Sequence, residues 1–79
     1  GQARGAAEFE LALPAPAEVA VEVFDLAGRH VASLARGPLD AGRHRLRWSA
    51  AGADVRAGIY FVRARWPGFE AVRRVVRVD

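Results

Sequence analysis

Hydrophobic and polar residues alternate along most of this chain with the two-residue period of a β-strand. The segments that carry this alternation are residues 8–13, 18–24, 29–34, 43–48, 57–66 and 70–78. Turn-forming residues separate them at short intervals, and no segment keeps a helical period over three turns. The pattern therefore predicts an all-β fold, an immunoglobulin-like (Fn3-like) antiparallel β-sandwich of six or seven strands.

The segment over residues 57–66 is the richest in β-forming side chains. Both of its faces are apolar near the start, and one face then carries Arg63 and Arg65. This arrangement is typical of a central strand that is covered on both sides at one end only. In immunoglobulin-type sandwiches, a tyrosine at the start of a late central strand bonds back to the preceding loop. We therefore expect Gly58 and Tyr60 to be structural residues.

A tight hairpin turn is predicted between the second and third segments. The Asp25 side chain can accept hydrogen bonds from the turn backbone, and Gly28 tolerates a positive φ. The returning segment is irregular, because Val31 and Leu34 cannot both face inward in a flat strand. We expect a β-bulge there, followed by a connection over residues 35–42.

The chain has 79 residues and is 52% hydrophobic, which is enough for one small domain with a core. It has no cysteine, so packing must stabilise the fold without a disulfide. We expect residues 1–6 to be a flexible leader and residues 7–79 to be a single sandwich module. No apolar run approaches the roughly 18 residues of a membrane span, and the first residues look like the middle of a longer protein.

The net charge of +3 comes from 12 arginines without any lysine, and it is unevenly distributed. Residues 1–40 carry six acids and three arginines, whereas residues 41–79 carry nine arginines and three acids. We expect the two halves to neutralise each other across neighbouring strands. Alternatively, the arginines at 43–47 and 63–65 form one anion-binding face flanked by Trp66, if those strands are neighbours. Few aromatic residues lie among the arginines, so no nucleic-acid partner is expected.

Residues suited to catalysis are scarce. His30 and His44 have no second ligand at the spacing of a metal site, and neither serine lies in a nucleophile motif. The sequence predicts no catalytic residue, no metal site, no cofactor and hence no enzyme. Trp48 faces inward in the alternation, whereas Trp66 lies beside a turn and is the candidate contact for a glycan.

Five stretches of the chain, taken in order, resemble one known family. Residues 13–16 resemble its Tyr-Pro-Asn-Pro opening, and residues 23–31, which include Asp25, Gly28 and Arg29, resemble its hydrophobic-Tyr-Asp-x-x-Gly-Arg-x-Val hairpin. Further similar stretches are the Leu-x-x-Gly-x-His step at 39–48, the Gly-hydrophobic-Tyr strand at 57–63 and the basic, valine-rich last strand at 73–78. The family is the C-terminal sorting domain of type IX secretion substrates, with a relative in the immunoglobulin-like domain of the flagellar hook-capping protein. Ala15 departs from the usual asparagine, and arginine replaces the usual lysine near the end.

This resemblance implies a non-catalytic C-terminal sorting module that directs its parent protein through the periplasm and by type IX secretion to the cell surface. The implied partners are the outer-membrane secretion machinery, a parent enzyme domain upstream and a surface glycan, and we expect the module to be a monomer. The residues expected to recognise the machinery are Arg73, Arg74, Val75, Val76, Arg77 and Val78. Two alternatives remain: a carbohydrate-binding module that uses Trp66 and the arginines, and a structural spacer of a multidomain secreted enzyme.

Overall fold

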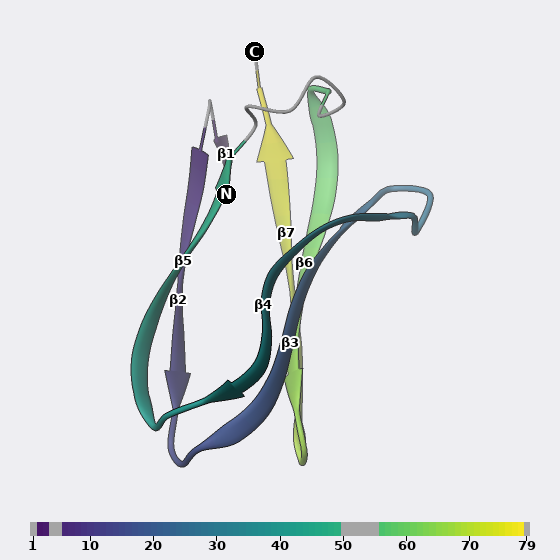
Figure 1. The fold of residues 1–79 in the computed structure, drawn as a ribbon. Helices are drawn as coiled ribbons and strands as arrows, with labels where there is room; N and C mark the ends of the chain where they lie inside the picture. The colour runs from purple at the N-terminus through teal and green to yellow at the C-terminus, as the bar shows by residue number, and fades with distance from the viewer. Residues whose placement is uncertain (1, 4–5, 50–55, 79) are drawn as a thin grey trace.

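The structure is a β-sandwich of two sheets that face each other (Figure 1). This computed structural model describes residues 2–3, 6–49 and 56–78. The strands are β1 (Gln2–Ala3), β2 (Ala6–Leu13), β3 (Ala17–Asp25), β4 (His30–Leu39), β5 (Gly42–Ser49), β6 (Gly58–Trp66) and β7 (Phe69–Arg77). The large sheet has the order β1-β7-β6-β3-β4, and the small sheet pairs β2 with β5. The predicted all-β antiparallel sandwich is confirmed, with one parallel pairing, that of β1 with β7.

The core lies between the two sheets and follows the predicted alternation. On β3, Val19, Val21 and Val23 face the small sheet, and Val23 is fully buried. The buried residues of the other strands are Ala7, Leu11, Leu13, Trp48, Tyr60, Val62 and Val75. Each fully buried valine contributes roughly 1.5–3 kcal/mol relative to an exposed one, so this double layer is the main source of stability in a chain without disulfides.

β4 is longer than the sequence predicts. The segment predicted as a connection after Leu34 continues as a strand through Gly37 and Pro38 to Leu39. A proline has no N–H to donate, so it is tolerated only at a sheet edge or a bulge. β4 is the edge strand next to β3 in the large sheet, and this position explains why Pro38 does not end it.

The predicted irregularity in the same strand is confirmed. The register between β4 and β3 shifts twice, and the two residues skipped by the pairing are Leu34 and Val31. Each skipped residue resets the alternation, so both side chains pack against the core despite their odd spacing.

Residues of the expected leader belong to strands where the structure describes them. Gln2 and Ala3 form β1, parallel to the end of β7, and Ala6 already belongs to β2. Gln2 and Ala3 thus pair through their backbone with the edge of β7. Residues 1, 4 and 5 of the expected leader, and residues 50–55 of the connection between β5 and β6, lie outside the described residues.

Candidate functional site

The turn between β3 and β4 is organised by the side chain of Asp25. Its Oδ1 accepts hydrogen bonds from the N–H groups of Ala27 at 3.0 Å and Arg29 at 2.9 Å, and its Oδ2 accepts one from Arg29 Nε at 3.0 Å. The Asp25 carbonyl accepts the Gly28 N–H at 3.0 Å, and Gly28 has a φ of 85°. The hydrogen bond from the Arg29 N–H is the main cause that lowers the pKa of Asp25 below its ordinary value. These contacts fix the shape of the hairpin.

Tyr60 is buried at the start of β6, and its hydroxyl donates a hydrogen bond of 2.7 Å to the carbonyl oxygen of Arg56. This is the bond to the preceding loop that a tyrosine corner requires. Gly58 lies between the two residues with a φ of 151°, which a residue with a Cβ rarely adopts. The loop therefore enters β6 through a conformation that suits glycine and a hydroxyl that anchors the backbone.

The predicted recognition strand divides into a buried and an accessible part. Val75 and Arg77 face inward, with 4% and 6% of their surface exposed. The Arg77 guanidinium lies 5.1 Å from the centre of the Trp48 ring, so an aromatic face accommodates the buried cation. Val76 and Val78 are half-buried. Side-chain recognition through Val75 and Arg77 is therefore incompatible with the fold.

The accessible part of β7 runs from Phe69 to Arg74, where every residue is exposed. β6 pairs with β7 along its whole length on one side, whereas β1 covers the other side only at Val76 and Arg77. Within the described residues, the outer edge of β7 thus pairs with no second strand from Phe69 to Arg73. Arg73 ends this open stretch, and Arg74 follows it.

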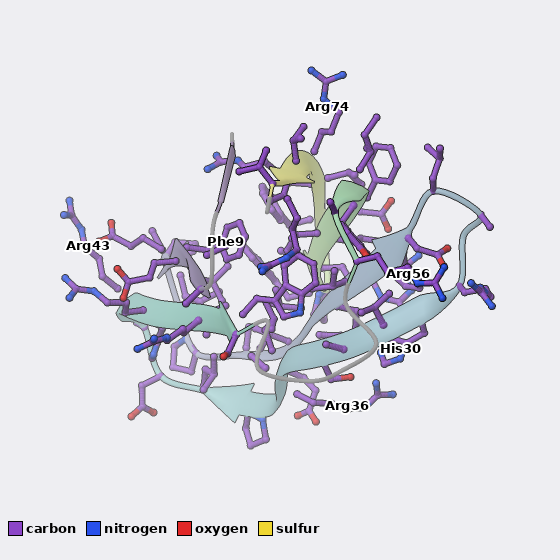
Figure 2. The ribbon with its side chains drawn as sticks, turned by 90° about the horizontal axis from the view of Figure 1, so that it is seen from above. Phe9, His30, Arg36, Arg43, Arg56 and Arg74 are labelled. Carbon is purple, nitrogen blue, oxygen red and sulfur yellow. The ribbon has the colours of Figure 1, made fainter. Side chains whose placement is uncertain are left out.

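The two arginine rows do not form one face. β5 belongs to the small sheet and β6 to the large sheet, so the condition for a shared face is not met. In the small sheet, Arg47 lies opposite Glu8 and Arg45 opposite Glu10, and Arg43 Nη1 is 3.8 Å from Glu10 Oε1. This is the expected neutralisation across strands. Figure 2 shows arginines of different strands pointing away from the molecule in different directions.

Three arginines and one histidine surround Glu22 on the outer face of the large sheet, and we call this group the Glu22 cluster. Glu22 Oε1 is 3.4 Å from Arg63 Nη2 and 3.9 Å from Arg65 Nη2. Its Oε2 is 3.4 Å from His30 Nε2 and 3.5 Å from Arg36 Nη1. Although Glu22 points away from the core, only 8% of it is exposed. Three guanidinium charges against one carboxylate leave the cluster with an excess of two positive charges.

The sequence did not indicate this cluster, because its members come from three strands. The alternation correctly placed Glu22 on the polar face of β3. The convergence depends on the order β6-β3-β4, which brings Arg63 directly opposite Glu22 and puts Arg36 on the other neighbouring strand. The one hint in the sequence was that residues 41–79 carry more arginines than residues 1–40 carry acids.

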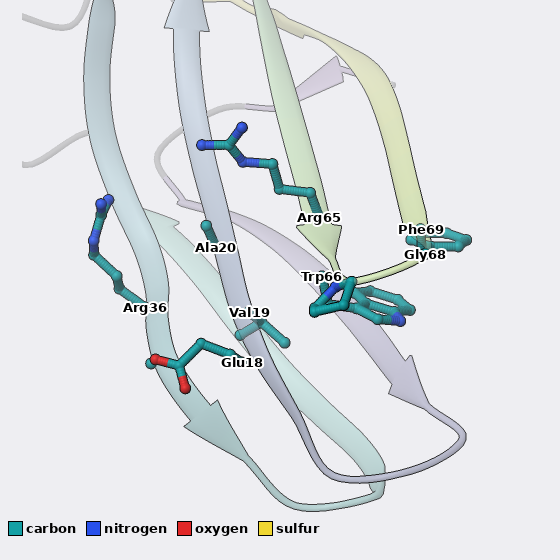
Figure 3. A pocket seen from close by; sticks show the side chains of 10 residues that line it. Glu18, Val19, Ala20, Arg36, Arg65, Trp66, Gly68 and Phe69 are labelled. Atoms are coloured by element: carbon teal, nitrogen blue, oxygen red, sulfur yellow. The ribbon is translucent and has the colours of Figure 1, made fainter.

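An open notch of about 440 Å³ lies beside the Glu22 cluster (Figure 3). It forms because β6 stops following β3 at Ala20, whereas β3 extends back to Ala17. The residues around it include Glu18, Ala20, Arg36, Arg65, Trp66 and Phe69. We call this hollow the β3–β6 notch.

Trp66, the candidate glycan contact, borders the β3–β6 notch but is not a free platform. Its ring stacks on that of Phe69, with centroids 4.1 Å apart and planes inclined by 13°. It is half-buried and packs against the core, whereas Phe69 is 45% exposed. Phe69, which follows the β6–β7 turn, is the more accessible aromatic residue here, and the sequence did not single it out.

In the part of the chain that the structure describes, no His, Cys, Asp and Glu side chains gather in a group of three or more that could hold a metal ion. His44 instead lies within 2.7 Å of the Asp40 carbonyl oxygen, at the boundary of the core. No helix among the described residues is long and apolar enough to cross a membrane.

Comparison with known protein families matches residues 1–66 to the FlgD Ig-like domain. The chain belongs to this family. The FlgD Ig-like domain is a non-catalytic type of domain, and the match supports the hook-capping side of the resemblance together with the immunoglobulin-like fold. Comparisons with curated proteins and with solved structures found no match.

The matched residues of this FlgD Ig-like domain include β1 to β6 and end at Trp66. β7, from Phe69 to Arg77, lies beyond them. The strand with the open edge is thus the part of the sandwich that the family match does not cover.

Proposed function

We propose that this domain is a non-catalytic sorting module that directs its parent protein through type IX secretion to the cell surface. The observation that carries the proposal is the outer edge of β7, which pairs with no second strand from Phe69 to Arg73 among the described residues. A free edge can pair through its backbone with an extended segment of another protein. In this proposal the partner is the secretion machinery of the outer membrane, and the module reaches it from the periplasm as a monomer attached to a parent enzyme domain.

The exposed arginines of the same strand support recognition at this edge. Arg73 and Arg74 are both exposed, and successive residues of a strand point to opposite faces. A partner strand that pairs with β7 would therefore meet one arginine on each side. Charge-assisted contacts of this kind weaken as salt screens them, so binding to the machinery should be salt-sensitive.

Delivery of a reporter tests the proposal. We would fuse the module to a periplasmic reporter in a host with type IX secretion and measure the fraction that reaches the surface or the medium. Val72 is 58% exposed on β7, so Val72→Lys should place a charge at the edge without disturbing the core. Delivery should fall with Val72→Lys and with Arg73→Ala/Arg74→Ala, and it should persist with the matched variant Val72→Thr, which keeps a β-branched side chain.

A reporter that stays in the periplasm with the intact module contradicts sorting. The second candidate, a structural spacer, then becomes the better explanation. It is favoured by the match to the FlgD Ig-like domain, which covers the sandwich up to Trp66 without β7. A spacer needs the fold but not the edge, so Val72→Lys and Val72→Thr would behave alike in any assay of the parent protein.

A further inference from the structure

We propose that the β3–β6 notch binds an acidic sugar, a ring that carries one carboxylate and several hydroxyl groups. The notch has a volume of about 440 Å³, within the range of roughly 300–1,000 Å³ typical of ligand pockets. It also has cationic, anionic and aromatic side chains at different points of its wall. This proposal concerns a different part of the molecule from the β7 edge and does not depend on sorting.

The two arginines of the notch are placed to hold a carboxylate between them. Arg36 on β4 and Arg65 on β6 both lie directly opposite Ala20, the small residue of the strand between them. Strands two apart in a sheet are separated by about 10 Å, so a gap remains above the short Ala20 side chain. Figure 3 shows the Arg65 side chain reaching toward β3, with Arg36 on the far side of that strand.

Glu22 orients the two guanidinium groups, but their N–H donors remain available to a ligand. Both approach Glu22, at 3.5 Å for Arg36 and 3.9 Å for Arg65, which is longer than a hydrogen bond between charged groups. Neither makes a hydrogen bond to another described residue. Each guanidinium has five N–H donors, and a ligand carboxylate can accept two of them side by side. Because Glu22 is also shared with Arg63, it cannot neutralise the pair.

The remaining residues around the notch suit the rest of a sugar ring. Glu18 is exposed there and makes no ion pair within the described residues. An ionised carboxylate only accepts hydrogen bonds, so Glu18 would accept them from ligand hydroxyl groups. The stacked rings of Trp66 and Phe69 leave the sheet on the face opposite to Arg65, and they border the end of the notch with an apolar edge for the C–H groups of the sugar. One acid among several hydroxyls is therefore favoured over an acidic peptide.

Titration of the 79-residue protein with trigalacturonic acid tests the proposal, with maltotriose as the neutral trisaccharide. Binding is followed by tryptophan fluorescence and by calorimetry. We expect saturable binding of the acidic trisaccharide and none of the neutral one. Arg36→Gln/Arg65→Gln should weaken it at least about tenfold, because two charge-assisted contacts are lost. The matched control Arg45→Gln/Arg47→Gln removes the same charge from the small sheet and should change the affinity by less than about twofold.

A second variant tests the site without removing the arginines, in case the double arginine variant misfolds. Ala20→Leu keeps every charge and fills the floor of the notch, so it should abolish binding while thermal unfolding shows an intact fold. The proposal is overturned by equal binding of maltotriose, by equal loss in the control, or by no saturation at millimolar concentrations. Binding of hexaglutamate with the same affinity and the same arginine dependence would also overturn it, in favour of an acidic peptide.

Discussion

The two ends of β6 each carry an aromatic pair, and the two pairs differ in their relation to solvent. At the first end, Tyr60 meets Trp48 edge-on, with centroids 4.9 Å apart, and both residues are buried between the sheets. At the other end, Trp66 stacks on Phe69 at 4.1 Å, beside an open notch. The residue types are nearly the same, so their neighbours decide which pair is structural.

The two aromatic pairs have different neighbours because β3 pairs with only part of β6. At the closed end, Tyr60 lies opposite both Asp25 and Val75, so strands flank β6 on both sides. At the open end, β6 pairs only with β7 beyond Arg65, since β3 has already diverged. The closed end can therefore stabilise the fold, and the open end has space for a ligand.

The largest expected effect comes from truncating one tryptophan at each end. Trp48→Ala should lower the free energy of unfolding by about 3–5 kcal/mol, because it removes a large buried side chain and leaves a cavity. Trp66→Ala should cost only about 1–2 kcal/mol, since part of that ring is already in water. Urea unfolding at neutral pH measures both. Equal losses would show that the two ends of β6 are equally closed to solvent.

Removing or adding one hydroxyl group gives a smaller difference in stability between the two ends of β6. Tyr60→Phe should lower the free energy of unfolding by about 1–2 kcal/mol, because the Arg56 carbonyl loses its buried donor. The matched change Phe69→Tyr adds a hydroxyl at the open end and should stay within about 0.5 kcal/mol of the parent. An unchanged thermal midpoint for Tyr60→Phe would show that the hydrogen bond from Tyr60 to Arg56 does not stabilise the fold.

The smallest effect concerns the Asp25 turn at the closed end. The pKa of Asp25 is lowered in the folded state, so its ionised form stabilises the hairpin above the ordinary pKa of about 3.9, and this contribution is lost as the pH falls through the lowered value. Asp25→Asn removes the titrating group, so the stability difference between the parent and this variant should shrink below about pH 4. Carboxyl chemical shifts from NMR would locate the titration directly, and a midpoint above the ordinary value would contradict the turn geometry.

Much of the closed end could be predicted from the sequence because its signals are local. The inward position of Trp48 follows from the alternation of its own strand. The turn follows from Asp25 and Gly28, and the role of Tyr60 follows from its place after Gly58. Even the bulges were indicated, since Val31 and Leu34 could not both face inward otherwise.

The open end could not be predicted because it depends on which strands are neighbours. The sequence suggested a connection at Gly37 and Pro38, and only the edge position of β4 allows the strand to continue. It grouped Arg77 with the exposed arginines, although Trp48, from the other sheet, receives that side chain. Similarly, no local pattern shows that Arg36 and Arg65 flank the same alanine.

The two bulges and Pro38 in β4 have a consequence for self-association. A bulged edge strand that contains a proline is a poor template for another strand, whereas the open stretch of β7 has neither feature. The large sheet can therefore grow from one edge only. Pairing between two copies through β7 would use up both open edges and end at a dimer, so the route from this sheet to an extended fibre is closed.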